Sequence, residues 1–94
     1  MKELFDKCRE KWGLRAQILM LAEECSELSV ATLHLLRNKK QENALEHFAE
    51  EIADVELMLD EMKYYFHNVP LIAKYRKLKE KRLRILVGEG DSKP

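Results

Sequence analysis

Two short acidic segments of the chain share one arrangement of residues, and their carboxylates could together bind a metal ion. The first segment contains Glu24 and Glu27, and the second contains Glu51 and Asp54, each position 27 residues after its counterpart. Residues three positions apart on a helix project side by side, about 4.5 Å apart along the axis. If two such helices pack antiparallel, the four carboxylates can face one another, and a divalent cation would relieve their repulsion.

The donor types indicate which metal ion such a site would take. Carboxylates alone favour Mg²⁺, with Mn²⁺ as the alternative, because both ions prefer oxygen ligands with water completing an octahedron. A carboxylate-bridged di-iron site needs a Glu-x-x-His pair on two helices, and no histidine here has an acidic residue three positions before it. Zinc is not favoured, because suitably spaced Cys and His ligands are missing near the acidic segments. His47 precedes Glu51 by one turn, so it could touch the site or lie on the surface.

Helices must position these side chains, because helix-forming residues dominate and no run alternates with the period of a strand. Breaks at Gly13, near 38–41, at 68–70 and from Gly88 leave four segments. The predicted helices cover about residues 2–11, 14–37, 41–67 and 70–86. We therefore expect an all-α fold, a four-helix bundle in one domain over residues 1–87, followed by a flexible tail over residues 88–94.

The two long helices each carry a stripe of apolar residues, with the carboxylates at its margin. At about 100° per residue, the stripe on the second helix consists of Ile18, Leu21, Cys25, Leu28, Thr32, Leu35 and Leu36. The stripe on the third helix consists of Phe48, Ile52, Val55, Leu59, Met62 and Phe66. We expect the stripes to pack together, with Glu24 and Glu51 at their edges. The remaining acidic residues considered on these helices are expected to face solvent: Glu23, Glu50, Glu56 and Glu61.

The formal net charge is zero, with 17 basic and 17 acidic residues, but the charges are unevenly distributed. Residues 1–62 contain 8 basic and 14 acidic residues, whereas residues 63–94 contain 9 and 3. An acidic body suits cations, and a basic arm suits anions such as phosphate. Lys79 and Arg82 are the best candidates for phosphate contacts, although a solvated helix face is the alternative. Nucleic-acid binding is not favoured, because the rest of the chain is acidic and no stacking aromatic array accompanies the basic residues.

The length and hydropathy of the chain indicate where the protein resides and whether it forms oligomers. No apolar stretch approaches the roughly 20 residues of a membrane span, and there is no signal-peptide pattern, so we expect a soluble cytoplasmic protein. The two cysteines are not spaced as a metal clip, and a reducing compartment disfavours a disulfide between them. One short protomer has too little surface to cover both stripes and the fourth helix, so we expect a dimer or a tetramer.

The motif residues match a known family. The sequence Glu23-Glu24-x-x-Glu27-Leu28, followed by Glu50-Glu51-x-x-Asp54 and Lys79-x-x-Arg82-Leu83, resembles the MazG-type, all-α nucleoside triphosphate pyrophosphohydrolases. Trp12-Gly13 with Gln17 is similar to the beginning of short MazG-like proteins. The resemblance covers roughly residues 5–86 and implies a helical bundle that associates as a dimer or a dimer of dimers.

The resemblance also implies an activity, namely hydrolysis of a nucleoside triphosphate, often a deoxy or non-standard one, to the monophosphate and pyrophosphate. It implies these Mg²⁺ ligands: Glu24, Glu27, Glu51 and Asp54. Glu24 or Glu27 would orient or deprotonate the attacking water, and Lys79 and Arg82 would contact phosphate. Trp12 could stack on a base, although a single Trp near the start of a domain more often belongs to a core or an interface. A non-catalytic helical interaction module and a small nucleic-acid-binding protein stay as alternatives, and no pattern identifies the base or sugar.

Overall fold

The computed structural model describes residues 1–37 and 42–89, which form four α-helices. The helices are α1 (Lys2–Trp12), α2 (Leu14–Arg37), α3 (Glu42–Phe66) and α4 (Val69–Leu86). Because the described residues contain no strand, the predicted all-α class and the number of helices are confirmed. Helix α4 begins one residue earlier than predicted, with Pro70 in its first turn, where the missing amide hydrogen costs no hydrogen bond. The predicted start of the third helix at residue 41 and the tail from residue 90 lie outside the described residues.

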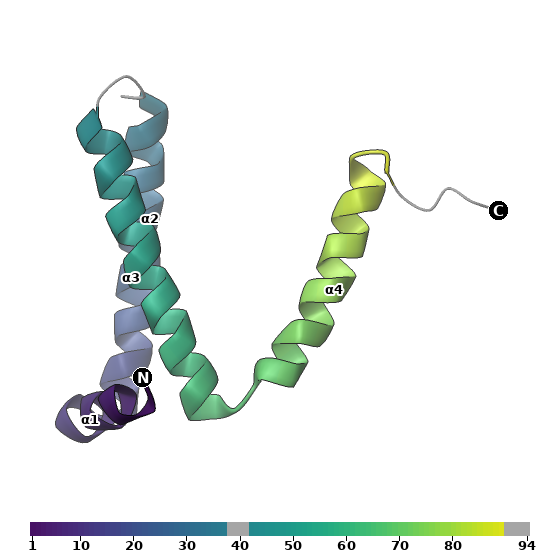
Figure 1. The fold of residues 1–94 in the computed structure, drawn as a ribbon. Helices are drawn as coiled ribbons and strands as arrows, with labels where there is room; N and C mark the ends of the chain where they lie inside the picture. Colours follow the sequence, from purple (N-terminus) through teal and green to yellow (C-terminus); the bar gives the residue numbers. More distant parts are fainter. Residues whose placement is uncertain (38–41, 90–94) are drawn as a thin grey trace.

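Helices α2 and α3 form an antiparallel hairpin, and α1 lies across the end where α2 begins and α3 finishes (Figure 1). Gly13 joins α1 to α2 with φ at 87°, in the region that glycine adopts without strain. A Cβ at Gly13 would meet nothing within 4 Å. The backbone conformation, and not lack of space, therefore favours glycine at this corner.

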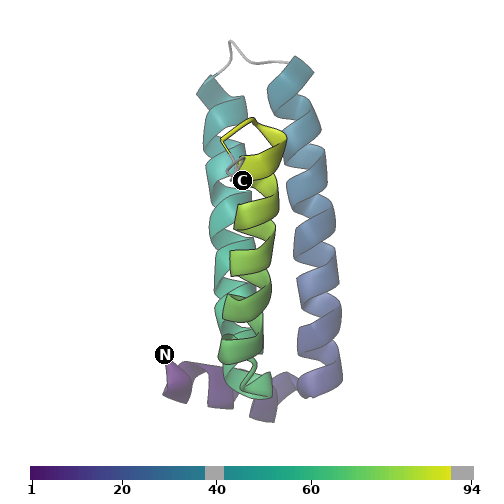
Figure 2. The ribbon, with the colours of Figure 1, turned by 90° about the vertical axis from the view of Figure 1, so that its right-hand side faces the viewer.

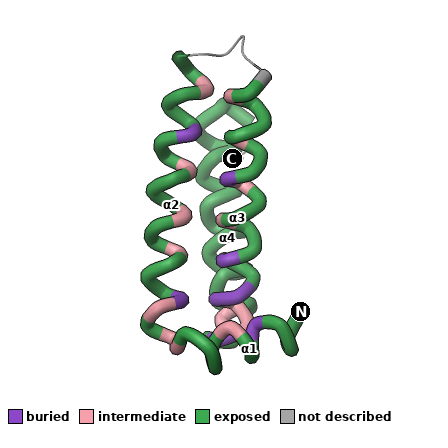
Figure 3. The backbone as a smooth tube through the Cα atoms, turned by 90° about the vertical axis from the view of Figure 1, so that its left-hand side faces the viewer, coloured by how far each residue is buried: buried purple, intermediate pink, exposed green. Residues whose placement is uncertain are grey.

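The hydrophobic core lies at the α1 end of the hairpin (Figure 3). It is a cluster of buried residues, with Leu14, Leu21 and Tyr64 packed against it: Phe5, Met58, Met62 and Tyr65. The Tyr65 hydroxyl is hydrogen-bonded to the Phe5 carbonyl at 2.7 Å and to Glu61 Oε2 at 2.6 Å. Phe5 is thereby attached to α3 by packing and by a polar contact.

Glu61 corrects one prediction, because it is 3 % exposed rather than solvated. Its position four residues before Tyr65 places the carboxylate beside the tyrosine hydroxyl, one helical turn away. The hydrogen bond explains how an acidic side chain is tolerated inside the core. The expectation for Glu23, Glu50 and Glu56 was correct, since all three are exposed.

Helices α2 and α3 do not contact each other along the centres of the predicted apolar stripes. On each helix, the buried face is rotated about the helix axis toward the side that carries the carboxylates. On α2, Ala31 and Gln17 are buried, whereas four members of the predicted stripe are exposed: Ile18, Cys25, Thr32 and Leu36. On α3, Glu51 and Met58 are buried while Leu59 and Phe66 are exposed. The other members of both stripes are buried or half-buried. The prediction that the stripes pack together was therefore half right, and Glu24 and Glu51 lie nearer the middle of the contact than its margin.

Helix α4 is an arm that diverges from the hairpin, and the two together form an open V (Figure 1). All of its residues are exposed, and Figure 2 shows α4 in front of the hairpin, seen from the side to which the arm diverges. His67 turns the chain with φ at 48°, and Asn68 is the N-cap residue of α4. Packing of α4 into a four-helix bundle is thus not seen within one protomer. In the described part of the chain, no helix has the length and apolarity that crossing a membrane requires.

Candidate metal centre

Three carboxylates converge where α2 and α3 meet. Glu24 comes from α2, and Glu51 and Asp54 come from α3; one oxygen of each lies within 4.8 Å of the others. The three differ in depth, because Glu51 is 8 % exposed, Glu24 is half-buried and Asp54 is exposed. The cluster therefore has a buried end at Glu51 and an end open to solvent at Asp54.

Two carboxylate oxygens of this cluster are buried. Glu24 Oε2 and Glu51 Oε2 have no hydrogen-bond partner among the described residues. A buried ionised oxygen without a partner is strongly unfavourable, and buried polar atoms in folded proteins are nearly always satisfied. These two oxygens indicate either bound protons or a cation between the helices.

The local electrostatics favour positive charge at this point. The pKa of Glu51 is raised, first by burial and then by repulsion from Glu27 and Asp54. Burial is also the largest cause of the raised pKa of Glu24, and repulsion from Glu27, Asp54 and Glu51 adds to it. A divalent cation would reverse this effect, because it stabilises the ionised form of every carboxylate that it contacts.

Glu27 lies at the edge of the cluster. Its charge raises the pKa of both Glu24 and Glu51, which places it nearby, but it is exposed and is not among the three residues with converging oxygens. The structure thus brings all four predicted carboxylates into one neighbourhood, with three as a compact set and Glu27 on its solvent side.

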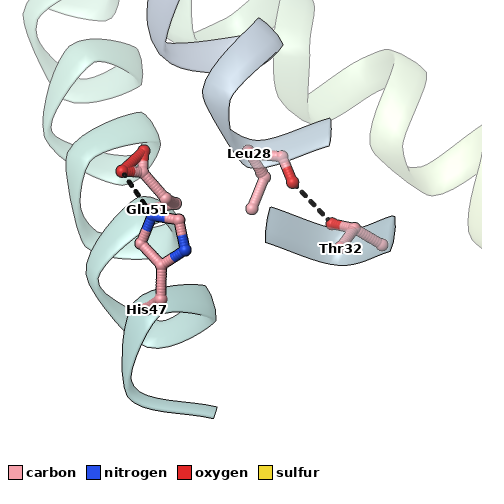
Figure 4. Close-up of polar contacts among 4 residues, drawn as sticks. All are labelled: Leu28, Thr32, His47 and Glu51. Atoms are coloured by element: carbon pink, nitrogen blue, oxygen red, sulfur yellow. Dashed lines mark hydrogen bonds and ion pairs between the residues drawn. The ribbon is translucent and has the colours of Figure 1, made fainter. Parts of the chain in front are cut away.

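His47 contacts the buried end of the site (Figure 4). Its Nε2 atom lies 3.7 Å from Oε1 of Glu51, and its charge lowers the pKa of Glu51, against the larger effects that raise it. The spacing of four residues on one helix is the signal that identifies this pair in the sequence. Sequence reasoning left His47 open between a surface position and the site; it contacts a member of the site while its side chain stays 47 % exposed.

Thr32 of α2 is drawn in the same view, but its hydroxyl forms its hydrogen bond within its own helix and not with the site. Its hydroxyl donates to the Leu28 carbonyl of the same helix at 2.7 Å (Figure 4). That hydroxyl is therefore satisfied within α2.

Both cysteines are free, and neither belongs to the converging set. The donor set is thus all carboxylate oxygen, which fits Mg²⁺ or Mn²⁺ and not a thiolate-preferring ion.

The predicted substrate-binding residues lie away from the carboxylates within one protomer. Trp12 is 55 % exposed at the end of α1, with Lys11 Nζ 5.2 Å from its ring centroid. Leu14 and Glu24 are ten residues apart on α2, about 15 Å along the axis, so Trp12 is not next to the cluster. Lys79 and Arg82 are exposed on α4, the arm that diverges from the hairpin.

Comparisons of the chain with protein-family models, with curated proteins and with solved structures find no match. The resemblance to MazG-type enzymes therefore rests on the sequence motif, and the assignment to that family stays a prediction. The converging carboxylates are the structural feature from which a function can be inferred.

Proposed function

We propose that this chain is a Mg²⁺-dependent nucleoside triphosphate pyrophosphohydrolase that converts a (deoxy)nucleoside triphosphate to the monophosphate and pyrophosphate. The observation that carries the proposal is the pair of buried oxygens of Glu24 and Glu51 beside Asp54, which have no hydrogen-bond partner among the residues that the structure describes. Residues that served stability alone would be apolar at this contact, because an unpaired buried carboxylate is costly. The class of reaction comes from the motif resemblance to MazG-type enzymes.

The four carboxylates together would form the metal site in this proposal. Glu24, Glu51 and Asp54 would hold Mg²⁺, or Mn²⁺ as the alternative, and Glu27 would complete the set from the solvent side. When bound, the ion supplies charge neutralisation for the phosphate oxygens and polarises the phosphoryl group. His47 Nε2 lies 3.7 Å from Oε1 of Glu51, so a protonated His47 would attract that carboxylate without being a ligand of the ion.

Glu27 and Glu24 are the two candidates for the general base. Glu27 is exposed and lies outside the converging set, so it is the carboxylate most accessible to a water. Glu24 is half-buried, and as a ligand it would be a weaker base than Glu27, because the ion stabilises its ionised form. Either residue would orient the water and accept its proton as the water attacks the α-phosphorus, and pyrophosphate would leave.

A non-catalytic interaction module is the second candidate function. The observation that favours it is α4, whose apolar residues are exposed along its length, among them Leu71, Tyr75, Leu78 and Leu83. Such a module would bind a partner through α4 and would show no response to Mg²⁺. The enzyme, in contrast, is expected to act as a cytoplasmic homo-oligomer, and its melting temperature should rise with Mg²⁺ and nucleotide.

The test is release of pyrophosphate from a panel of nucleoside and deoxynucleoside triphosphates in the presence of Mg²⁺. Glu51→Gln and Asp54→Asn should each lower the rate at least about 100-fold, since each removes a charged ligand of the proposed centre. Glu56→Gln is the matched control on the same helix, because Glu56 is exposed and lies outside the converging set. Absence of pyrophosphate with every nucleotide, or wild-type rates for both ligand variants, would overturn the proposal.

A further inference from the structure

Helix α4 has two unlike sides, and all of its residues are exposed. Exposed apolar residues that gather on one side of a helix indicate a surface that another body covers. At about 100° per residue, most of the apolar side chains of α4 lie in one arc, which includes Leu71, Ile72, Tyr75, Leu78, Leu83 and Ile85. This apolar arc needs a covering environment that the described part of the chain does not supply.

The cations of α4 surround the apolar arc. Lys74 and Lys81 lie along one border of the arc, and Arg76 lies along the other. Lys79 and Arg82 lie within the arc, where a long basic side chain can pack along apolar neighbours and extend only its charged end. In total, α4 contains seven basic residues and one acidic residue. The surface that accepts α4 must therefore offer apolar contact together with negative charge on both borders of the arc.

Most of these cations are not neutralised by the described residues. Arg76 pairs with Glu80 at 3.1 Å, and Arg84 pairs with Glu89 at 2.9 Å. The other five basic residues of α4 form no ion pair in the part of the chain that the structure describes: Lys74, Lys77, Lys79, Lys81 and Arg82. Their charges are thus available for anionic groups outside the chain.

Tyr75 lies near the centre of the arc, with its side chain half exposed. The Nζ atom of Lys74 lies 5.6 Å from the centroid of the Tyr75 ring. A tyrosine has an apolar ring and a polar hydroxyl, and a lysine has an apolar stem and a charged end. Side chains of this kind suit a boundary between an apolar layer and a charged, hydrated layer.

An anionic phospholipid surface meets both requirements of α4 at once. Its headgroup phosphates attract basic residues, and the acyl boundary beneath them accepts the apolar side of a helix that lies in the plane of the surface. Nucleic acid supplies phosphates for the cations but no apolar layer for the arc. A protein groove would have to pair Lys79 and Arg82 individually in a desolvated contact, whereas mobile headgroups can rearrange around them.

We infer that α4 docks on the surface of an anionic phospholipid membrane, with its apolar arc at the boundary between headgroups and acyl chains and its cations among the headgroup phosphates. The arm diverges from the hairpin (Figure 1), so α4 is presented separately from α3. That helix contains eight acidic residues and one lysine, and the same surface would repel it. The docking does not rest on the proposed function.

Co-sedimentation of the full-length protein with lipid vesicles tests the docking. A chelator is present, so that no divalent ion connects the carboxylates to lipid. The wild type should bind vesicles that mix phosphatidylcholine with phosphatidylglycerol at least about tenfold more tightly than vesicles of phosphatidylcholine alone, because each basic residue near an anionic surface adds to the attraction. Equal binding to the two kinds of vesicle, or binding to neither, would overturn the docking.

Two matched variants separate insertion of the arc from attraction between charges. Leu78→Asp and Ala73→Asp both add one negative charge at an exposed position of α4, but Leu78 lies in the arc and Ala73 lies on the opposite side. Leu78→Asp should lose at least about tenfold in affinity for the mixed vesicles, whereas Ala73→Asp should keep most of it. Circular dichroism should show unchanged helix content in both variants. Equal losses of affinity would overturn insertion of the arc.

Fluorescence gives a measurement of the contact that does not depend on affinity. The double variant Tyr75→Trp with Trp12→Phe has its single tryptophan in the arc of α4, and its emission should shift to shorter wavelength when mixed vesicles are added. In the wild type the single tryptophan is Trp12 on α1, and its emission should not change. An unchanged emission from α4, or a shift from Trp12 alone, would overturn the docking through α4.

Other occupants of the arc would give different results. If duplex DNA bound the wild type and Leu78→Asp equally while vesicles bound neither, α4 would be a nucleic-acid surface. If the wild type were an oligomer that Leu78→Asp makes monomeric, and vesicles bound neither, a second copy would cover the arc. Either result would overturn the membrane docking, whereas a lack of pyrophosphate release alone would overturn only the proposed function.

Discussion

Glu24 and Glu51 meet across the contact between α2 and α3, where one oxygen of each carboxylate is buried without a hydrogen-bond partner among the described residues. Apolar residues in their place would make the hairpin more stable. The folded chain thus contains a local destabilisation that a cation would remove. This relationship leads to measurable consequences for pH, for metal and for the packing that holds the two helices.

The first prediction concerns pH in the absence of metal. The pKa values of Glu24 and Glu51 are raised from the ordinary value of 4.5, first by burial. As the pH falls through a raised folded-state pKa, the folded chain takes up a proton before the unfolded chain does, so the free energy of unfolding rises. Between that pKa and about 4.5 the metal-free protein should therefore melt at a higher temperature than at neutral pH.

Thermal melts in a chelator, from pH 7.5 down to pH 5, would measure this effect. Other groups titrate in the same range, so the informative quantity is the difference in melting temperature between the wild type and a double variant. The double variant carries both Glu24→Gln and Glu51→Gln. The double variant should melt at a higher temperature than the wild type at pH 7.5, and the gap should narrow as the pH falls. A gap that is constant with pH would contradict raised pKa values at these two residues.

The second prediction concerns Mg²⁺. A ligand that binds the folded state alone stabilises it by about 2.7 kcal/mol at 100 times its Kd, which raises the melting temperature of a domain of this size by about 10 °C or more. Wild-type protein at pH 7.5 should show a rise of this order. Asp54→Asn, which keeps the size of the side chain but removes its charge, should lose most of it.

Glu56→Gln is the control for the Mg²⁺ response, because Glu56 is an exposed acidic residue on the same helix as Asp54. This variant should keep the full response to Mg²⁺. Calorimetric titration with Mg²⁺ alone, without nucleotide, would show whether the ion binds independently of any activity. Equal responses of the wild type and Asp54→Asn would remove the metal centre from consideration.

The number and type of the helices could be predicted from the sequence, because glycine, proline and polar breaks separate segments of strong helix formers. The side of each long helix that forms the contact could not. The pattern on α2 contains an apolar edge with Ile18 and Leu36 and a second edge with Gln17 and Ala31. A helical wheel identifies residues that share a face, but it does not indicate which of two adjacent faces the neighbouring helix covers.

The residues of the candidate site could be predicted from the sequence, but the extent of their burial could not. The spacing of Glu24 and Glu51 identified the carboxylates that converge, but it does not indicate how deeply they are buried. Ala31, two turns from Glu24 on the same face, is 0 % exposed, so the neighbouring helix covers this face of α2. The Glu61–Tyr65 contact was missed because an acidic residue four positions from a tyrosine is common on solvated helices. The position of α4 depends on the turn at His67, whose positive φ has no clear signal in the sequence.

The third prediction concerns the attachment of α1. Tyr65→Phe removes the hydroxyl that is hydrogen-bonded to the Phe5 carbonyl and to Glu61. Because Glu61 would remain buried without its partner, the free energy of unfolding should fall by about 1–3 kcal/mol. Urea denaturation would measure the loss. Tyr64→Phe is the control, since the Tyr64 hydroxyl donates to Asp6 at an exposed position and its removal should have a smaller effect; equal losses for both variants would contradict the buried network.

The fourth prediction links the packing of the hairpin to the metal centre. Ala31 is fully buried between α2 and α3, so Ala31→Leu must push the two helices apart and should lower stability by about 1–3 kcal/mol. The same displacement would separate Glu24 from Glu51 and Asp54, and the stabilisation by Mg²⁺ should be lost although every carboxylate is present. Ala22→Leu adds the same side chain at an exposed position of α2 and should keep both stability and the response to Mg²⁺. An Ala31→Leu protein that melts at a lower temperature but still responds fully to Mg²⁺ would show that the centre does not depend on close approach of the two helices.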